Sequence, residues 1–142
     1  MGDALPTKVI TKMIHRTHRF HGRTSLRFVY KNGQTVRGSY SALKYACNPR
    51  RRTYRVAVVV SRKVSKSAVV RNRIRRRTYE AVALLAPHIT RPYDMVFTVF
   101  SDQLATVEYE ELFTTVKTQL QKAGIMMDFD EPSSEKRAIV EN

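Results

Sequence analysis

The sequence lacks tryptophan, has a single cysteine, Cys47, and has no aspartate or glutamate from residue 4 to residue 79. One cysteine excludes an internal disulfide and a CxxC metal clip. No apolar run approaches the ~20 residues of a membrane span, and the N-terminus has no apolar segment of signal-peptide length. We therefore expect 142 residues of this composition to form one cytoplasmic domain with an aliphatic core.

The charge is distributed very unevenly along the chain. Its net value is +14, and residues 4–79 hold 21 Lys and Arg with no acid, whereas the rest holds 5 basic and 12 acidic residues. Self-repulsion of this kind destabilises a compact state unless a polyanion neutralises it. Because no basic amphipathic helix with bulky apolar anchors is present, we expect nucleic acid and not a membrane as the partner.

The hydrophobic pattern predicts helices at residues 19–32, 67–86 and 106–123, and strands at residues 39–46, 54–60 and 95–100. A few strands covered by helices indicate an α+β fold, a two-layer α/β sandwich. We expect residues 1–14 to form a flexible basic arm and residues 15–125 the RNA-binding domain. Residues 126–142 are acidic and are expected to form a disordered tail.

The strongest local signal is the segment SRKVSKSAVVRNRIRRR, which leads from an apolar strand through a polar turn into a helix. At 100° per residue its core stripe is Val70, Ile74, Thr78, Ala81 and Leu85. The opposite side carries Arg71, Asn72, Arg75, Arg76 and Tyr79, and Arg73 and Arg77 flank the stripe. Guanidinium groups bind phosphate oxygens in pairs of hydrogen bonds and stack on bases, so this pattern favours RNA contact over a solvated helix face.

Catalysis by the polypeptide itself is disfavoured. Two-metal nucleases need converging carboxylates, and the basic half of the chain has none. His15, His18 and His21 would share a face of a helix, but Gly22 ends the run. Solvated or RNA-contacting histidines are therefore favoured over acid–base catalysis or zinc binding.

The segment VVVSRKVSKSAVVRNRIRRRTYEA, with Arg71-Asn72-Arg73 near its centre, resembles the signature of the bacterial ribonuclease P protein family. The likeness extends through HRFHGRTSLRFVYKNG upstream and YDMVFTVF downstream, over residues 15–125. It implies the order α-β-β-(β)-α-β-α with a left-handed βαβ crossover. It also implies a subunit, monomeric in its holoenzyme, that joins a catalytic RNA and assists removal of the 5′ leader from precursor tRNA.

The resemblance also implies roles for individual residues. The RNA-binding positions would be Arg62, Lys63, Arg71, Asn72, Arg73, Arg75, Arg76 and Tyr79. A cleft between the first helix and the sheet would bind the leader through Leu26, Tyr30 and Tyr45, with Leu26 at a position where Phe is common. No catalytic residue or protein-bound metal is implied, since Mg²⁺ would be held mainly by the RNA. The alternative for Tyr30 and Tyr45 is that they are ordinary half-buried core tyrosines. The alternative for the whole protein is a ribosomal or RNA-chaperone protein on the same scaffold.

Overall fold

The computed structural model describes residues 23–126, and the side chains of its first helix from residue 26 onward. The elements are α2 (Arg23–Asn32), β2 (Gln34–Arg37), β3 (Ser41–Cys47), β4 (Arg55–Val60), α3 (Ala68–Leu85), η2 (Ala86–His88), β5 (Tyr93–Val99), η3 (Asp102–Ala105) and α4 (Tyr109–Lys122). The expected basic arm, His15, His18, His21 and residues 127–142 of the expected acidic tail lie outside the described residues. Met126, the first residue of that expected tail, is buried against the main core. None of the helices between residues 23 and 126 has the length and apolar character of a membrane span.

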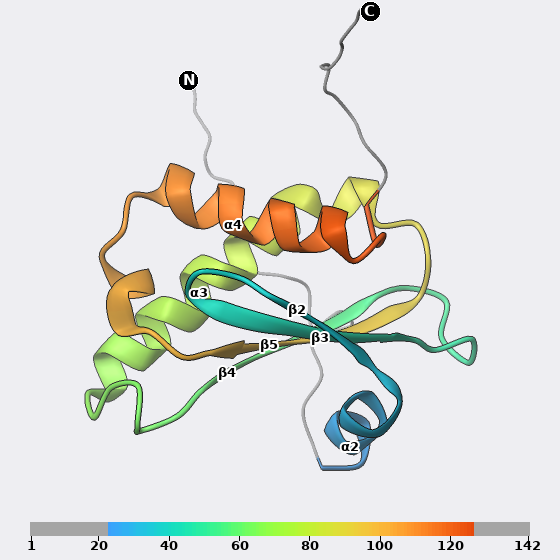
Figure 1. Ribbon diagram of the computed structural model, residues 1–142, viewed down its shortest axis with the longest axis horizontal. Helices are drawn as coiled ribbons and strands as arrows, with labels where there is room; N and C mark the ends of the chain where they lie inside the picture. The colour runs from blue at the N-terminus through green and yellow to red at the C-terminus, as the bar shows by residue number, and fades with distance from the viewer. Residues whose placement is uncertain (1–22, 127–142) are drawn as a thin grey trace, which may run out of the picture.

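The four strands form one mixed sheet in the order β2-β3-β5-β4. Strand β3 pairs antiparallel with both β2 and β5, and β4 pairs parallel with β5 through a crossover that contains α3. Helices α3 and α4 cover one face of the sheet, and α2 lies against the other face (Figure 1). The predicted α+β class and the order of its elements are confirmed, with β2 as the additional strand.

The main core lies between the sheet and helices α3 and α4. Alternate residues of β3, β4 and β5 point into it, and Leu43 and Phe97 are completely buried there. A smaller core lies on the other face, where Val29 of α2 packs with Ala57 and Val96. Because both faces are covered, β4 and the middle of β5 are almost continuously apolar.

Helix α3 begins and ends close to where the sequence predicts. The side chain of Ser67 caps it by accepting a hydrogen bond from the Val70 N–H at 3.2 Å. Its last residue, Leu85, is followed by the short η2 helix that contains Pro87. Its buried face is wider than the predicted stripe and also includes Tyr79 and Val82, since α3 packs against β4 at the edge of the sheet.

The β2–β3 hairpin is fixed to the rest of the molecule by Gly33 and Gln119. The buried Gln119 of α4 donates to the carbonyl oxygen of Ser41 at 2.9 Å. A Cβ at position 33 would lie 2.5 Å from the carbonyl oxygen of Val29 and 2.7 Å from that of Tyr45. Glycine is therefore required at the end of α2 by the close approach of two backbone segments.

Helix α4 starts later than the predicted 106–123 span. Residues Asp102–Ala105 form the separate 3₁₀ helix η3, and α4 runs from Tyr109 to Lys122. Gly124 adopts φ 77°, and the next N–H, of Ile125, bonds to the Leu120 carbonyl oxygen at 3.0 Å. The predicted glycine cap of this helix is confirmed.

Candidate nucleic-acid interface

The exposed side of α3 carries four polar side chains that we call the arginine face: Arg71, Asn72, Arg75 and Arg76. Asn72 and Arg76 are exposed, and Arg71 and Arg75 are partly exposed. Arg75 donates a hydrogen bond to the side-chain oxygen of Asn72. No carboxylate in the described part of the chain forms an ion pair with the arginine face. Its guanidinium groups are thus available to an external anion.

The turn that precedes α3 carries Arg62 and Lys63, both exposed. The carbonyl oxygen of Ser61 accepts two backbone N–H groups within this turn, at 3.1 and 3.4 Å. A guanidinium nitrogen of Arg71 donates to the carbonyl oxygen of Ser65 at 2.9 Å. This bond connects the turn that carries Arg62 and Lys63 to the arginine face.

Two further arginines of α3 bond to backbone within the protein. Arg73 Nε donates to the carbonyl oxygen of Ala105 at 2.8 Å. Arg77 donates to the carbonyl oxygens of Leu104 and Val107, each at 2.5 Å. Burial lowers the pKa of Arg77, and the positive charge of Arg73 lowers it further. The structure therefore gives Arg73, which remains exposed, an internal bond in addition to the RNA contact proposed for it.

Tyr79 does not lie on the arginine face, contrary to the prediction. Only 8% of it is exposed, and its hydroxyl accepts a hydrogen bond from the backbone N–H of Val58 at 3.3 Å. The helical-wheel argument placed it opposite the core stripe. The helix lies over the edge strand β4, however, so the flank that faces this strand is buried as well. Val82, three residues further along α3, is the sequence signal that this flank is apolar.

A groove of about 600 Å³ lies at the end of the sheet where β3 ends and β5 begins. It is lined by Phe28, Asn32, Gln34, Tyr45, Ala46, Cys47, Pro49, Tyr93 and Ala123. The rings of Tyr45 and Tyr93 meet edge to face, with centroids 6.2 Å apart. The Tyr45 hydroxyl donates to Gln34 Oε1 at 3.1 Å. Flat rings and neutral amides are the groups that stack on unpaired bases and hydrogen-bond to their edges.

Tyr30 and Tyr45, both predicted in one cleft, lie on different faces of the sheet. Tyr45 packs against the main core with Leu43, two residues before it, as strand alternation requires. Lys44 lies on the face of β3 that α2 covers, and its Nζ lies 5.9 Å from the centroid of the Tyr30 ring. Tyr30 is 46% exposed, whereas Leu26 is partly buried against the smaller core. The structure thus brings Tyr30 together with Lys44, and places Tyr45 in the groove.

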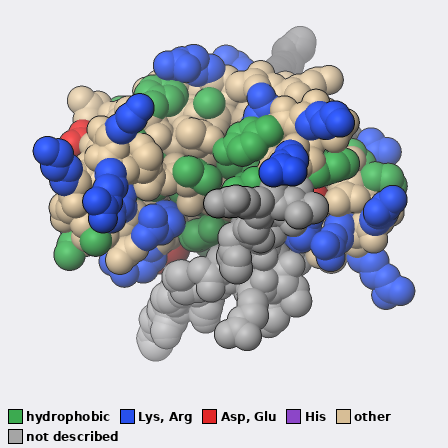
Figure 2. Space-filling view, turned by 90° about the horizontal axis from the view of Figure 1, so that it is seen from below, with side chains coloured by type: hydrophobic (Ala, Val, Ile, Leu, Met, Phe, Trp, Pro, Cys, Tyr) green, Lys and Arg blue, Asp and Glu red, His purple; other side chains and the backbone are tan. Residues whose placement is uncertain are grey.

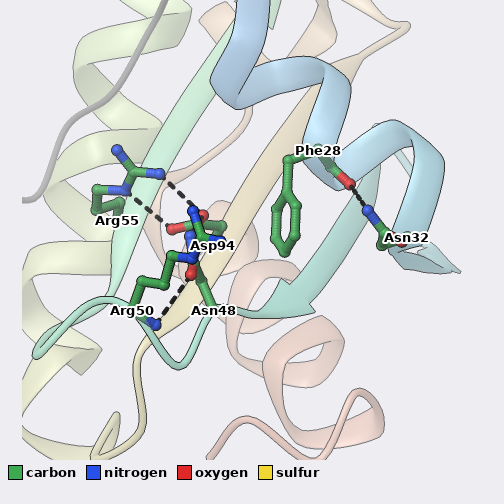
Figure 3. A network of polar contacts seen from close by, with 6 residues as sticks. All are labelled: Phe28, Asn32, Asn48, Arg50, Arg55 and Asp94. Atoms are coloured by element: carbon green, nitrogen blue, oxygen red, sulfur yellow. Dashed lines mark hydrogen bonds and ion pairs between the residues drawn. The ribbon is translucent and has the colours of Figure 1, made fainter.

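Phe28, Lys44 and Tyr93 were missed in the sequence. Phe28 projects from α2 toward the start of β5, as Figure 3 shows. Strand alternation separated Lys44 from Leu43, but it did not show that α2 covers the face on which Lys44 lies. Nothing in the sequence indicated Tyr93, because its position follows from the pairing with Cys47, which is far away in the sequence.

A buried ionic network includes Asn48, which lies between the groove residues Cys47 and Pro49. Asp94 has no exposed surface, and its carboxylate accepts hydrogen bonds from Arg55 Nε and from a terminal nitrogen of Arg55, both at 2.9 Å. The side-chain amide of Asn48 donates to Asp94 at 2.9 Å (Figure 3). Both carboxylate oxygens are occupied, so Asp94 is not available as a metal ligand. No group of three His, Cys, Asp or Glu within residues 23–126 could hold a metal ion.

The basic side chains are spread over the α2 side of the molecule. Figure 2 shows Lys and Arg toward both ends of this face, with exposed hydrophobic side chains between them. The turn with Arg62 and Lys63 lies at one end of β4, and the connection from β3 to β4 lies at the other (Figure 1). Phosphates at either end and bases between them would match this distribution.

The fold and this surface define an RNA-binding α+β protein. The family model for ribonuclease P matches residues 14–124. The ribonuclease P protein component of Roseiflexus castenholzii is 39% identical over 111 residues, which cover 78% of this chain and 89% of that protein. That of Chloroflexus aurantiacus is 37% identical over 113 residues, covering 80% and 82%. The chain belongs to the ribonuclease P protein family.

Solved structures support the fold. The ribonuclease P protein of Staphylococcus aureus superposes with a TM-score of 0.69 at 20% identity, covering 78% of this chain and 98% of that one. The protein from Thermotoga maritima gives a TM-score of 0.66 at 20% identity, covering 73% of this chain and 96% of that one.

Membership of the family shows what the chain does. It is the protein subunit of a ribonucleoprotein endoribonuclease that takes part in tRNA 5′ processing, with the ribonuclease P RNA as its partner. Membership of the ribonuclease P protein family excludes the alternative of a ribosomal or RNA-chaperone protein.

Proposed function

We propose that the arginine face, with Arg62 and Lys63, binds the catalytic RNA, and that the α2 side binds the 5′ leader of precursor tRNA. The observation that carries the first part is a row of exposed or partly exposed guanidinium groups with no carboxylate partner among the described residues. Arg75 and Asn72 hold each other in position, which reduces the ordering cost of binding. Arg73 would add a contact through the guanidinium nitrogens that its bond to Ala105 leaves free.

Leader binding would use two neighbouring surfaces. The exposed ring of Tyr30, with the ammonium group of Lys44 beside it, offers one stacking and one phosphate-binding group. The groove lined by Phe28, Tyr45 and Tyr93 offers further stacking surfaces. Stacking on an aromatic side chain contributes about 1–3 kcal/mol per base and tolerates any base, which suits leaders of varied sequence.

The chemical step would belong to the RNA, where bound Mg²⁺ activates the attacking water. The role of the protein would then be to hold the leader and to neutralise phosphates, so that the metal sites of the RNA fill at lower Mg²⁺ concentration. We propose that one copy acts per catalytic RNA, in the cytoplasm where the precursor is transcribed.

The first test is a cleavage assay at low Mg²⁺ with the catalytic RNA, a precursor tRNA and the full chain. We expect the protein to restore leader removal under conditions in which the RNA alone is slow, and the protein alone to cut nothing. Cleavage that is unaffected by the protein would contradict the proposal. Metal-dependent cleavage by the protein alone would place the chemistry on the polypeptide.

The second test removes two charges from the arginine face. Arg75→Ala/Arg76→Ala should weaken binding to the catalytic RNA and reduce the slope of log K against log salt by roughly 0.7–0.9 per lost phosphate contact. The matched control, Arg91→Ala/Lys122→Ala, removes the same charge from two exposed positions outside α3. Equal slopes for the two double variants would show that net charge, and not the arginine face, determines affinity.

The third test concerns the leader. Tyr30→Ala should weaken binding of precursor tRNA by about 1–3 kcal/mol and leave the affinity for mature tRNA unchanged. A photo-crosslinker on Cys47, the single cysteine of the chain and part of the groove wall, should label leader nucleotides. Equal loss for both tRNAs, or labelling of the catalytic RNA alone, would move the leader site elsewhere.

A further inference from the structure

We propose that the connection between β3 and β4, residues 48–53, is a second phosphate-binding site that holds the leader where it leaves the groove. We call this connection the arginine loop, since it contains Arg50, Arg51 and Arg52 in succession. The inference rests on the proposed binding of the leader in the groove. It extends the proposed leader-binding surface beyond Tyr30 and the groove. The extension lies at the end of the sheet opposite to the turn that carries Arg62.

The first residue of the arginine loop, Asn48, forms four hydrogen bonds that anchor the start of the loop. The backbone N–H of Asn48 donates to the Pro92 carbonyl oxygen at 2.9 Å, and its side-chain amide donates to Asp94 at 2.9 Å. Its side-chain oxygen accepts the N–H of Arg50 at 3.1 Å, and its carbonyl oxygen accepts the N–H of Arg51 at 3.0 Å. Two of these bonds thus anchor Asn48, and the other two hold the backbone of Arg50 and Arg51. Figure 3 shows the bonds of Asn48 with Asp94 and Arg50.

The charge of the arginine loop is not neutralised within the described residues. Arg50 and Arg51 are exposed and form no ion pair with any residue between 23 and 126. The nearby acid, Asp94, is buried and already pairs with Arg55. Three adjacent like charges in a fixed turn repel one another, and a bound phosphate chain would relieve that repulsion.

The arginine loop is continuous with the groove. Cys47 and Pro49, on either side of Asn48, both line the groove. Arg50 directly follows Pro49, so an RNA strand that passes Pro49 meets the arginines next. A wall that stacks on bases, followed by guanidinium groups that bind phosphates, is the combination by which proteins hold single strands without regard to sequence.

Arg52 differs from its two neighbours and provides an internal control. It lines a different hollow of about 380 Å³, together with Thr53, Tyr54 and residues from the end of α3. We therefore assign the phosphate contacts to Arg50 and Arg51. The double variant Arg52→Gln/Lys122→Gln removes two exposed charges that do not line the groove, and is matched to Arg50→Gln/Arg51→Gln.

The experiment measures binding of the holoenzyme to precursor tRNAs with leaders of graded length, and to mature tRNA. For long leaders, Arg50→Gln/Arg51→Gln should weaken binding and reduce the salt slope by about 1.4, or about 0.7 for each single-strand phosphate contact. For leaders too short to leave the groove, and for mature tRNA, affinity should be unchanged. Arg50→Lys/Arg51→Lys, which keeps the charge, should retain most of the slope.

Three results would overturn the inference. One is equal loss for short and long leaders, which would place the arginine loop on another part of the RNA. The second result is that Arg50→Gln/Arg51→Gln loses no affinity for a leader of any length. The third is that the Arg52→Gln/Lys122→Gln control loses as much affinity for long leaders as Arg50→Gln/Arg51→Gln does. If the groove itself does not bind the leader, the unmodified protein will show no dependence on leader length. That outcome contradicts the proposed function, whereas a dependence that the double variant retains contradicts only the arginine loop.

Discussion

Tyr79 provides a sharp test of how α3 divides its residues between the core and the RNA. The structure buries its ring at the edge of the sheet and uses its hydroxyl as the acceptor for the Val58 N–H. Tyr79→Phe removes that acceptor and keeps the ring. Tyr79→Ala removes both, and leaves a cavity between α3 and β4.

The expected magnitudes follow from these contacts. Loss of one partner of a buried hydrogen bond costs about 1–3 kcal/mol, and the bond here is long, at 3.3 Å, so we expect about 1 kcal/mol for Tyr79→Phe. Removal of a buried aromatic ring costs about 3–5 kcal/mol, which we expect for Tyr79→Ala. For a domain of this size, a loss of 1 kcal/mol lowers Tm by roughly 4 °C.

Urea denaturation followed by circular dichroism measures the stability, and RNA affinity is measured separately at a temperature where each variant is folded. We expect Tyr79→Phe to be less stable and to bind the catalytic RNA with unchanged affinity and salt slope. A variant with full stability and weakened RNA binding would refute the assignment, because the hydroxyl would then face the RNA. A matched comparison is Arg76→Ala, in which affinity should fall while stability stays within about 0.5 kcal/mol.

Three further predictions concern the groups that hold the site in place. Asp94→Asn should lower stability by about 3–5 kcal/mol in urea denaturation, since it leaves a guanidinium group largely buried without its partner carboxylate. Burial raises the pKa of Tyr54 and of Tyr109 to about 12. Folding thus favours the protonated forms of both tyrosines, so the free energy of unfolding should fall as pH rises from about 10 to 12. The fall should be less steep in Tyr109→Phe. If that variant leaves the pH dependence of stability unchanged, burial of Tyr109 is not its cause. Gly33→Ala would place a methyl group 2.5 Å from the Val29 carbonyl oxygen, and should destabilise the protein and weaken leader binding together; a variant that melts like the unmodified protein would contradict this contact.

Local patterns in the sequence predicted most of the fold. Ser67 and Pro87 mark the ends of α3, and the periodicity between them identified most of the buried side chains. The two-residue alternation of β3 was equally clear, but it does not say which face α2 covers. The family resemblance assigned Tyr45 to the cleft beside α2, whereas the structure packs Tyr45 against the main core and places Lys44 beside Tyr30 of α2.

The remaining features of the site depend on contacts between distant segments. Helical periodicity placed Arg73 beside the core stripe, but it could not show that Arg73 bonds to a carbonyl 32 residues away. The network of Asp94 likewise joins three separate elements, and an acid of this kind looks unremarkable in the sequence. Contacts with distant segments decide which charged side chains bond within the protein. The periodicity of the charged segment itself does not show these contacts.

The two arginines that bond to the η3 region have a mechanical consequence for RNA binding. Arg73 and Arg77 together make three hydrogen bonds to backbone carbonyls on one side of α3. These bonds resist rotation of the helix about its own axis, and so fix the direction in which the opposite arginines point before any RNA is present. Loss of the two Arg77 bonds should then cost affinity through added freedom of α3 in the unbound protein, even though no proposed phosphate contact has been removed.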